Sequence, residues 1–185
     1  MDLPPTQLAR ARRGDRDALS ALVRHYQDRV YAVCVALAGT DAEDCAQDAL
    51  VKVLAAVHRF DPARGPSLGA WVMTITRRVC IDRSRAARIA RYADRQVDAF
   101  AAPGGDAEAH ARAALVRRAV LELPDEHRVV IVLRAWGELA YDEIAVLEGI
   151  PIGTVRSRLA RARDALRASL SPALASTLEV HDDVG

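Results

Sequence analysis

Apolar residues recur at steps of three and four along most of the chain, which is the spacing of amphipathic helices. The first such run begins at Asp15, and the second follows Asp41, a good helix-capping residue. The segment 60–67 holds two prolines and a glycine and predicts a loop, after which Ser67 can cap a third helix over 68–92. The expected inward positions are Leu19, Leu22, Val23, Tyr26, Val30 and Val33, then Ala42, Cys45, Ala46, Ala49, Leu50, Val53 and Val57, and finally Trp71, Val72, Ile75 and Val79.

The pattern changes in the second half of the chain. Between residues 94 and 110 the apolar period gives way to small residues around Pro103-Gly104-Gly105, which predicts a flexible linker. We therefore expect one domain over 1–93, a second over 111–170, and a tail at 171–185. The second domain should hold a short helix, a turn at Gly149 and a last helix to about Ser169, which together predict a helix-turn-helix. The expected inward stripe of this last helix is Ile152, Val155, Leu159, Ala162 and Leu166.

Composition supports an all-α fold of two small helical domains. Aromatic residues make up 4% of the 185 residues, and alanine, leucine and valine supply most of the apolar content, which suits packed helices. The net charge of +1 does not by itself indicate a nucleic-acid partner, so the distribution of charge matters more than its sum.

The last helix has a basic side opposite its apolar stripe. Residues 152–168 carry five arginines against one aspartate, a local charge of +4 in a nearly neutral chain. Small residues such as Gly153, Ser157 and Ala160 lie among these arginines and would let the helix enter a DNA groove. A merely solvated basic face is the alternative interpretation.

A second basic run occupies the later part of the third helix. Seven arginines over 77–95 face only Asp82 and Asp94, and Trp71 lies just upstream beside the loop that contains Phe60 and Arg64. Aromatic rings next to a basic strip suit unstacked single-stranded bases. Without that context, an ordinary solvated face would explain the run equally well.

The second helix presents an acidic side. If the apolar stripe of this helix faces inward, then Asp44, Asp48 and Val51 point outward, and Gln47 lies at the edge of this outward side. An exposed acidic strip that includes an apolar side chain favours a protein partner, since DNA would be repelled. An ordinary solvated face again remains an alternative.

Three ordered motifs resemble the extracytoplasmic-function sigma factors of bacterial RNA polymerase, over roughly residues 12–170. They are Asp41-Ala-Glu-Asp-Cys-Ala-Gln-Asp48, Trp71-Val-Met-Thr-Ile-Thr-Arg-Arg-Val-Cys-Ile-Asp82-Arg-Ser-Arg, and the stretch from Leu121-Glu-Leu-Pro124 through Tyr141-Asp-Glu-Ile-Ala145 to Pro151-Ile-Gly-Thr-Val-Arg-Ser-Arg-Leu-Ala-Arg-Ala-Arg163. The resemblance implies a transcription initiation factor whose first domain melts and reads the −10 promoter element and whose second reads the −35 element.

The resemblance also implies a role for each surface. The residues expected to dock on the β′ clamp helices of core polymerase are Asp44, Gln47, Asp48 and Val51. Those expected to recognise and melt the −10 element are Phe60, Arg64, Trp71, Arg77, Arg78, Arg83 and Arg85. Those expected to recognise the −35 element are Thr154, Arg156, Ser157, Arg161 and Arg163. Further expected partners are the β flap, promoter DNA and an anti-sigma factor. The sequence departs from the family pattern in two places: the pair Arg77-Arg78 stands where asparagine is usual, and Ala140 replaces a serine cap.

Other classes of function fit the sequence less well. An autonomous helix-turn-helix regulator would be expected to carry a sensory domain, whereas residues 1–92 predict helices with protein-binding and strand-binding surfaces. An enzyme would need a catalytic constellation, and neither paired carboxylates nor a phosphate loop is present. No metal or cofactor is expected, because the three cysteines and five histidines lack metal-ligand spacing. Lacking a signal peptide or a membrane-spanning run, the protein is expected in the cytoplasm.

Overall fold

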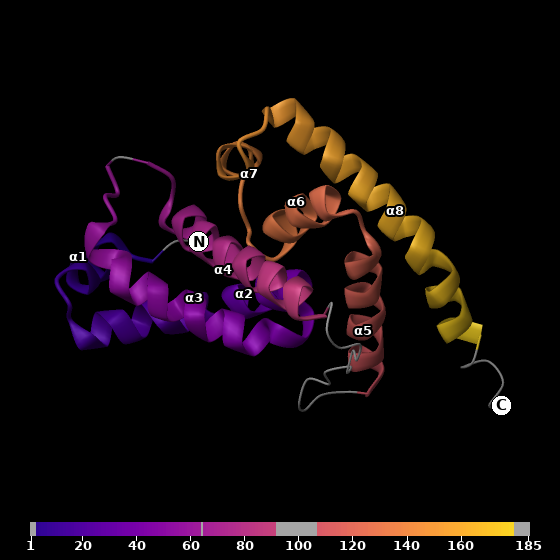
Figure 1. The fold of residues 1–185 in the computed structure, drawn as a ribbon, viewed down its shortest axis with the longest axis horizontal. Coiled ribbons are helices and arrows are strands. Elements are labelled where there is room, and N and C mark those ends of the chain that lie inside the picture. The colour runs from indigo at the N-terminus through magenta and orange to yellow at the C-terminus, as the bar shows by residue number, and fades with distance from the viewer. Residues whose placement is uncertain (1–2, 64, 92–106, 180–185) are drawn as a thin grey trace.

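The computed structural model describes the backbone of residues 3–63, 65–91 and 107–179, and within these ranges all side chains except those of 40, 84–91, 107–111 and 171–179. Every regular element in these parts is a helix, which confirms the all-α prediction (Figure 1). The α-helices are α1 (Pro5–Arg12), α2 (Arg16–Ala38), α3 (Ala42–Ala56), α4 (Leu68–Arg91), α5 (Ala107–Glu122), α6 (Asp125–Ala135), α7 (Tyr141–Glu148) and α8 (Ile152–Glu179), with short 3-10 helices at Gly39–Asp41 and Val57–Arg59.

The N-terminal domain is a bundle in which α2, α3 and α4 pack on one another and α1 packs on α2. Its three predicted helix starts are present, but Asp41 precedes α3 without accepting a capping hydrogen bond on its side chain, so the predicted Asp41 cap is wrong. Asp15 caps α2 by accepting a hydrogen bond from the Ala18 N–H at 3.0 Å, and Ser67 caps α4 by accepting one from the Ala70 N–H at 3.1 Å. The predicted stripes supply the core, including the fully buried Tyr26.

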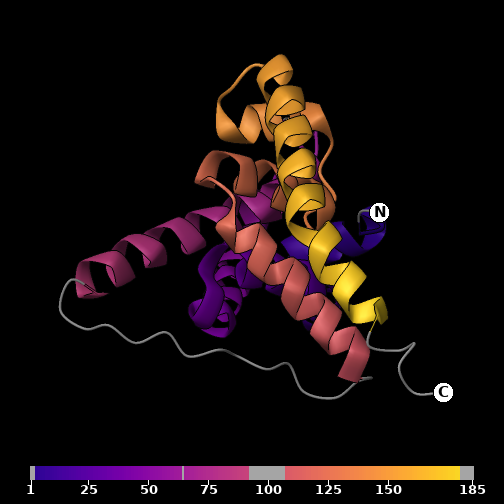
Figure 2. The same cartoon turned by 90° about the vertical axis from the view of Figure 1, so that its right-hand side faces the viewer.

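The C-terminal domain is built around α8, which contacts α5, α6 and α7. Figure 2 shows α8 running alongside α5. Ile144 of α7 and Val155 and Leu159 of α8 are almost fully buried, so the two helices of the helix-turn-helix share a core. A Cβ at Gly137 would lie 2.6 Å from the Leu133 carbonyl oxygen, so only glycine fits where the chain leaves α6.

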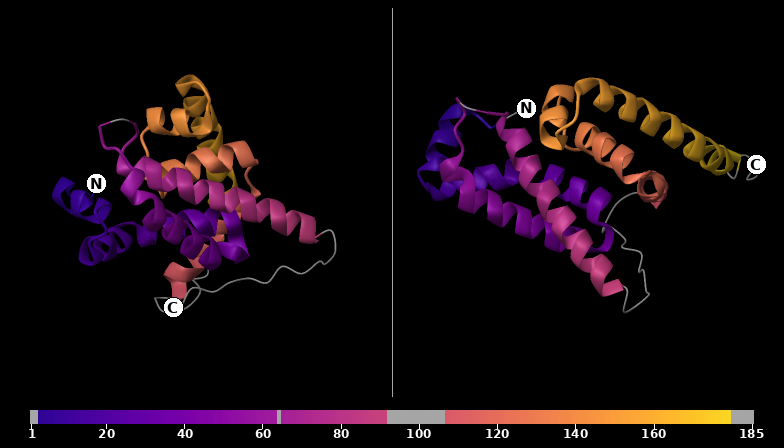
Figure 3. Two further views of the ribbon diagram at one scale, coloured as in Figure 1. Left: turned by 60° about the vertical axis from the view of Figure 1, so that its left-hand side comes forward. Right: turned by 45° about the horizontal axis from the view of Figure 1, so that its top comes forward.

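The two domains contact each other. Helix α2 touches α5 and α6, and α7 touches α4, beside whose first turns it lies (Figure 3). The buried side chains of both domains form one contiguous hydrophobic cluster. The structure therefore describes a closed arrangement, which the sequence analysis did not anticipate.

Three boundaries differ from the sequence expectation. Helix α1 was not predicted, because only Leu8 and Ala11 of its eight residues are buried and they do not make a visible stripe. Helix α5 begins at Ala107, inside the segment expected to be a linker. Helix α8 continues past Pro172, which ordinarily ends a helix. The remainder of the predicted linker and the last six residues lie outside the described chain.

Candidate nucleic-acid interface

Gly149 sets the turn of the helix-turn-helix. It lies in the left-handed region, at φ +65° and ψ +35°, where a Cβ is disfavoured. Its N–H donates to the Val146 carbonyl at 3.3 Å, and the Ile150 N–H donates to the Ala145 carbonyl at 3.1 Å. This hydrogen-bond pair ends α7, and α8 begins directly after Pro151.

Helix α8 has a buried side and an exposed side. Val155, Leu159 and Ala162 are buried, as predicted, whereas Ile152 is 40% exposed, so the inward stripe begins one turn later than expected. The reason is that Ile152 is the first residue of the helix and lies beyond the edge of the domain core. Arg156, Ser157, Arg161 and Arg163 are exposed, and Thr154 is half-buried.

The arginines of α8 differ in their partners. Arg158 donates to Glu126 at 2.6 Å and so ties α8 to α6. Arg163 reaches the Tyr141 hydroxyl at 3.4 Å. Among the described residues, no carboxylate pairs with Arg156 or Arg161. The cations available to a ligand are therefore fewer than the sequence count of five arginines.

The exposed side of α8 is electropositive enough to act on a neighbouring hydroxyl. The pKa of Tyr141 is lowered, first by the hydrogen bond and charge of Arg163, then by the charges of Arg134 and Arg156. Arg134 also stacks over the Tyr141 ring, with its guanidinium carbon 5.6 Å from the ring centroid. A positive potential at the start of α7 and α8 suits an anionic ligand.

The basic strip on α4 is partly occupied by carboxylates. Arg77 donates to Glu148 of α7 at 2.6 Å, and Arg83 is held by Asp44 and Asp48 of α3. Arg78 is exposed. Arg64 and the side chain of Arg85, both predicted to contact DNA, lie outside the described residues.

The two aromatic residues near the start of α4 are not equivalent. Phe60 is only 5% exposed and packs on Trp71 with ring centroids 5.2 Å apart, at an angle of 47°. Trp71 is half-buried. The expectation that both rings could stack on bases needs correction in this conformation, since the core covers Phe60 and Phe60 supports Trp71.

The acidic side of α3 is exposed as predicted, but it is not separate from the basic strip. Asp44, Gln47 and Val51 are exposed, Val51 by 64%. The Arg83 guanidinium lies 2.7 Å from Asp48 and 3.1 Å from Asp44, and these contacts, led by Asp48, raise the pKa of Arg83. The acidic side of α3 and the basic strip of α4 therefore meet at Arg83.

The three cysteines meet in the core of the N-terminal domain. Cys34, Cys45 and Cys80 are buried, and the sulfurs of Cys34 and Cys80 lie 3.7 Å apart. The pKa of Cys34 is raised by its contact with Cys80 and by burial, and burial raises that of Cys45 to about 12. In the described chain, no group of three potential ligands could hold a metal, and no helix has the length and apolarity to cross a membrane.

Comparison with known proteins identifies the family. The family model for sigma-70 region 2 matches residues 22–89, and the model for sigma-70 region 4 matches residues 113–166. The ECF RNA polymerase sigma factor SigW of Bacillus subtilis is 31% identical over 179 residues, covering 89% of this chain and 95% of SigW. The chain belongs to the extracytoplasmic-function sigma factors of the sigma-70 family.

Further relatives agree with this assignment. The ECF sigma factor RpoE of Cereibacter sphaeroides is 33% identical and covers 89% of this chain and 93% of its own. Two similar solved structures are CnrH in complex with the cytosolic domain of CnrY, with a TM-score of 0.66, and RpoE of Bartonella quintana in complex with the anti-sigma factor NepR, with a TM-score of 0.70. They are 27% and 26% identical and cover 90% and 82% of this chain and 96% of each solved chain. This sigma factor directs RNA polymerase to promoters as an initiation factor.

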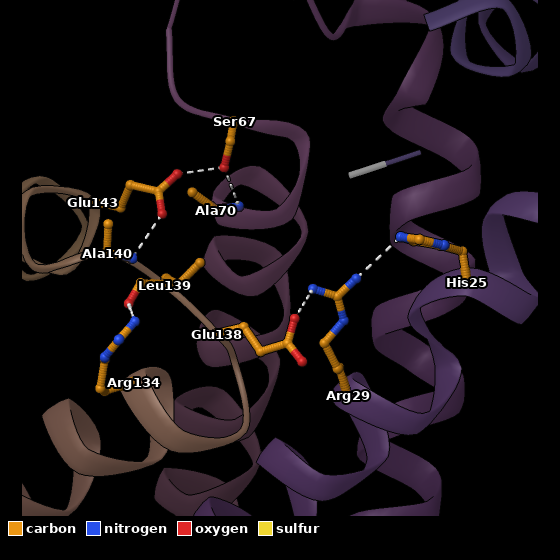
Figure 4. A network of polar contacts seen from close by, with 9 residues as sticks. All are labelled: His25, Arg29, Ser67, Ala70, Arg134, Glu138, Leu139, Ala140 and Glu143. Atoms are coloured by element: carbon orange, nitrogen blue, oxygen red, sulfur yellow. Dashed lines mark hydrogen bonds and ion pairs between the residues drawn. The ribbon is translucent and has the colours of Figure 1, made fainter. Parts of the chain in front are cut away.

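Sequence reasoning missed three glutamates of the region 4 domain that contact the region 2 domain. Glu138 binds a side chain of α2 and Glu143 binds one at the start of α4 (Figure 4), and Glu148 binds one within α4. Their regular spacing of five residues was available as a signal, but nothing in one sequence says that α7 lies against α4.

Proposed function

We propose that this sigma factor reads the −35 element with the exposed side of α8. Thr154, Arg156, Ser157, Arg161 and Arg163 would contact the DNA, with the side chains nearest the helix start reaching base edges and those further along reaching phosphates. The observation that carries the proposal is the exposure of Arg156, Ser157 and Arg161 opposite a buried stripe, on the second helix of a helix-turn-helix.

We assign docking on core polymerase to the exposed side of α3. Asp44, Gln47, Asp48 and Val51 would meet the β′ clamp helices, and region 4 would meet the β flap. An apolar side chain 64% exposed among carboxylates supports a protein partner over DNA.

We assign capture of the opened −10 strand to the start of α4 and the loop before it. Trp71 would stack on an unpaired base, and Phe60 would support the Trp71 ring by packing against it from the core. Arg77, Arg78 and Arg83, together with Arg64 and Arg85, would hold the strand by its phosphates. Because Arg77 and Arg78 replace the usual asparagine, base preference at −10 is expected to differ from that of relatives that keep it.

The factor would contribute binding energy only, and polymerase would perform the chemistry in the cytoplasm. Melting then draws on contacts made to the separated strand and not to the duplex. The similarity to two solved sigma factors bound to CnrY and to the anti-sigma factor NepR supports control of this chain by an anti-sigma factor as well.

Transcription in vitro with core polymerase and a library of randomised promoters tests this proposal. The expected result is a selected set of promoters that share an upstream and a downstream element, with no transcription from core alone. Tight, sequence-specific binding of the isolated chain to duplex DNA without any stimulation of polymerase would instead identify an autonomous regulator and refute the assignment.

A further inference from the structure

The core of the N-terminal domain holds a group of three cysteines, one on each of α2, α3 and α4. They are Cys34, Cys45 and Cys80, and none of them is more than 1% exposed. The sulfur atoms of Cys34 and Cys80 lie 3.7 Å apart. None of the three thiols takes part in the proposed function.

Packing alone does not require cysteine at these positions. Alanine and valine fill similar volumes, and the same core uses them at fully buried positions such as Val30, Val33 and Ala49. A thiol differs from these side chains in its redox chemistry. Two thiols held side by side in a packed core are already placed for one to react with the other.

The distance between Cys34 and Cys80 suits a disulfide after a small movement. Because a disulfide bond is about 2.05 Å long, the two sulfurs need to approach by roughly 1.6 Å from their separation of 3.7 Å. Helices α2 and α4 pack directly on each other, so side-chain rotation together with a slight shift of these helices can supply this movement.

Cys80 is the thiol of this pair that ionises more readily. Hydrogen bonding with Cys34 lowers the pKa of Cys80, burial opposes this change, and hydrogen bonding with Cys45 adds to the lowering. The contact with Cys80 and burial raise the pKa of Cys34. Because the thiolate is the nucleophile in thiol chemistry, Cys80 reacts first and Cys34 second.

We propose that Cys34 and Cys80 form a reversible oxidation site, at which a small hydroperoxide converts the two thiols to a disulfide that joins α2 to α4. The Cys80 thiolate attacks one oxygen of the hydroperoxide, so that an S–O bond forms, the O–O bond breaks and the other oxygen leaves as an anion. The Cys34 sulfur then attacks the Cys80 sulfur, forms the S–S bond and displaces hydroxide. The two thiol protons leave with the two oxygen anions, so hydrogen peroxide is reduced to two molecules of water. A dithiol reductant reverses the change.

The burial of the three cysteines selects the oxidant. Bulky reagents are excluded from a core in which no cysteine is more than 1% exposed, whereas hydrogen peroxide is small and uncharged. Asp44, the neighbour of Cys45 in the sequence, is exposed, and the charge of Arg83 acts on Cys45. The group therefore lies just beneath the surface of α3, and a local opening of α3 or α4 admits the oxidant.

The bridge should stabilise the domain that contains it. Residues 34 and 80 are 46 positions apart, and joining them removes conformational freedom from the unfolded chain. We expect the melting temperature of the oxidised chain to exceed that of the reduced chain by about 5 °C. This chemistry depends on the thiols alone and does not require the roles proposed for the surfaces of region 2.

Peptide mapping of the full chain tests the proposal. The chain is treated with a small molar excess of hydrogen peroxide, catalase removes the remaining oxidant, and free thiols are alkylated after unfolding. Trypsin leaves Cys34 and Cys45 together on residues 30–52, so a second protease that cleaves before Asp41 and Asp44 is needed to separate them. We expect a bridge between Cys34 and Cys80 with Cys45 alkylated, and loss of the bridge with dithiothreitol.

Two variants separate this pair from the third thiol. Cys80→Ala should form no intramolecular bridge and show no rise in melting temperature on oxidation. Cys45→Ala is the matched control, because it removes a thiol from the same core and keeps the pair, so it should respond as the unaltered chain does. Should either variant fail to fold, the peptide map of the unaltered chain decides the question.

Alkylation of all three thiols after peroxide treatment would overturn the proposal. A native bridge that includes Cys45 would do the same, as would a bridge that forms only when the chain is unfolded in urea. A bridge between Cys34 and Cys80 that leaves the melting temperature unchanged would refute its stabilising effect.

Discussion

The arginines of α8 and those of α4 differ in what they contact. On α8, Arg156 and Arg161 are exposed and no carboxylate of the described chain pairs with them. On α4, Arg77 and Arg83 are bound by glutamate and aspartate side chains from α7 and α3. Both helices show a similar excess of arginine in the sequence. Charge counts therefore locate candidate nucleic-acid surfaces, whereas only the fold tells which cations are available to DNA.

The largest effect is expected where the two kinds of surface meet, at Arg83. Reversing Asp44 and Asp48 to lysine should abolish co-purification with core polymerase, because the docking surface changes sign and Arg83 loses both partners. Glu43→Lys, on an exposed position of the same helix, is the control and should retain binding. If the double variant co-purifies with core polymerase as well as the unaltered chain does, then α3 is not part of the docking surface.

The two aromatic residues near the start of α4 should differ in their effects: Phe60 on the stability of the protein and Trp71 on melting of the promoter. Phe60→Ala should lower the free energy of unfolding by ~3–5 kcal/mol, because it empties a buried position. Trp71→Ala should instead weaken strand capture by ~1–3 kcal/mol, the usual contribution of one stacked base. Thermal melting and permanganate footprinting of the promoter measure the two effects. Equal loss of stability in both variants would mean that Trp71 is only a core residue.

The exposed arginines of α8 should show specificity effects. Arg156→Ala or Arg161→Ala should cost about 1–3 kcal/mol in promoter binding and relax preference within the upstream element, as expected for a side chain that reads a base edge. Promoter selection with the variant holoenzymes measures both quantities. A uniform loss across all sequences would assign these side chains to phosphates.

Arg158 should give the smallest effect, although it lies between Arg156 and Arg161 in the sequence. Its ion pair with Glu126 is partly exposed, so Arg158→Ala should lower stability by about 0–1 kcal/mol and leave the selected upstream sequence unchanged. A shift in the selected sequence would show that Arg158 leaves Glu126 to contact DNA.

Local pattern was sufficient to predict the helices that carry the surfaces. The stripes of α2 and α3, the Ser67 cap and the turn at Gly149 depend on residues close together in the chain, and each is present as expected. Helix α1 escaped prediction because it buries little, and Ile152 was misplaced because periodicity does not show where a core ends.

The pairings between distant residues could not be predicted. Arg77 and Glu148 are 71 positions apart, and Arg83 and Asp48 are 35 apart. A single sequence contains no signal for such contacts, because side chains at this separation meet only through the packing of whole helices. The roles of the surfaces came from family resemblance, and the availability of each side chain came from the structure.

Photo-crosslinking from position 157 most directly tests the claim that the exposed side of α8 reads promoter DNA. A crosslinking amino acid in place of Ser157, with position 122 of α5 as the control, would be assembled with core polymerase on a selected promoter. The account predicts crosslinks to the upstream element from position 157 and none from position 122. Crosslinks from position 157 only to protein, or only to the downstream element, would contradict it.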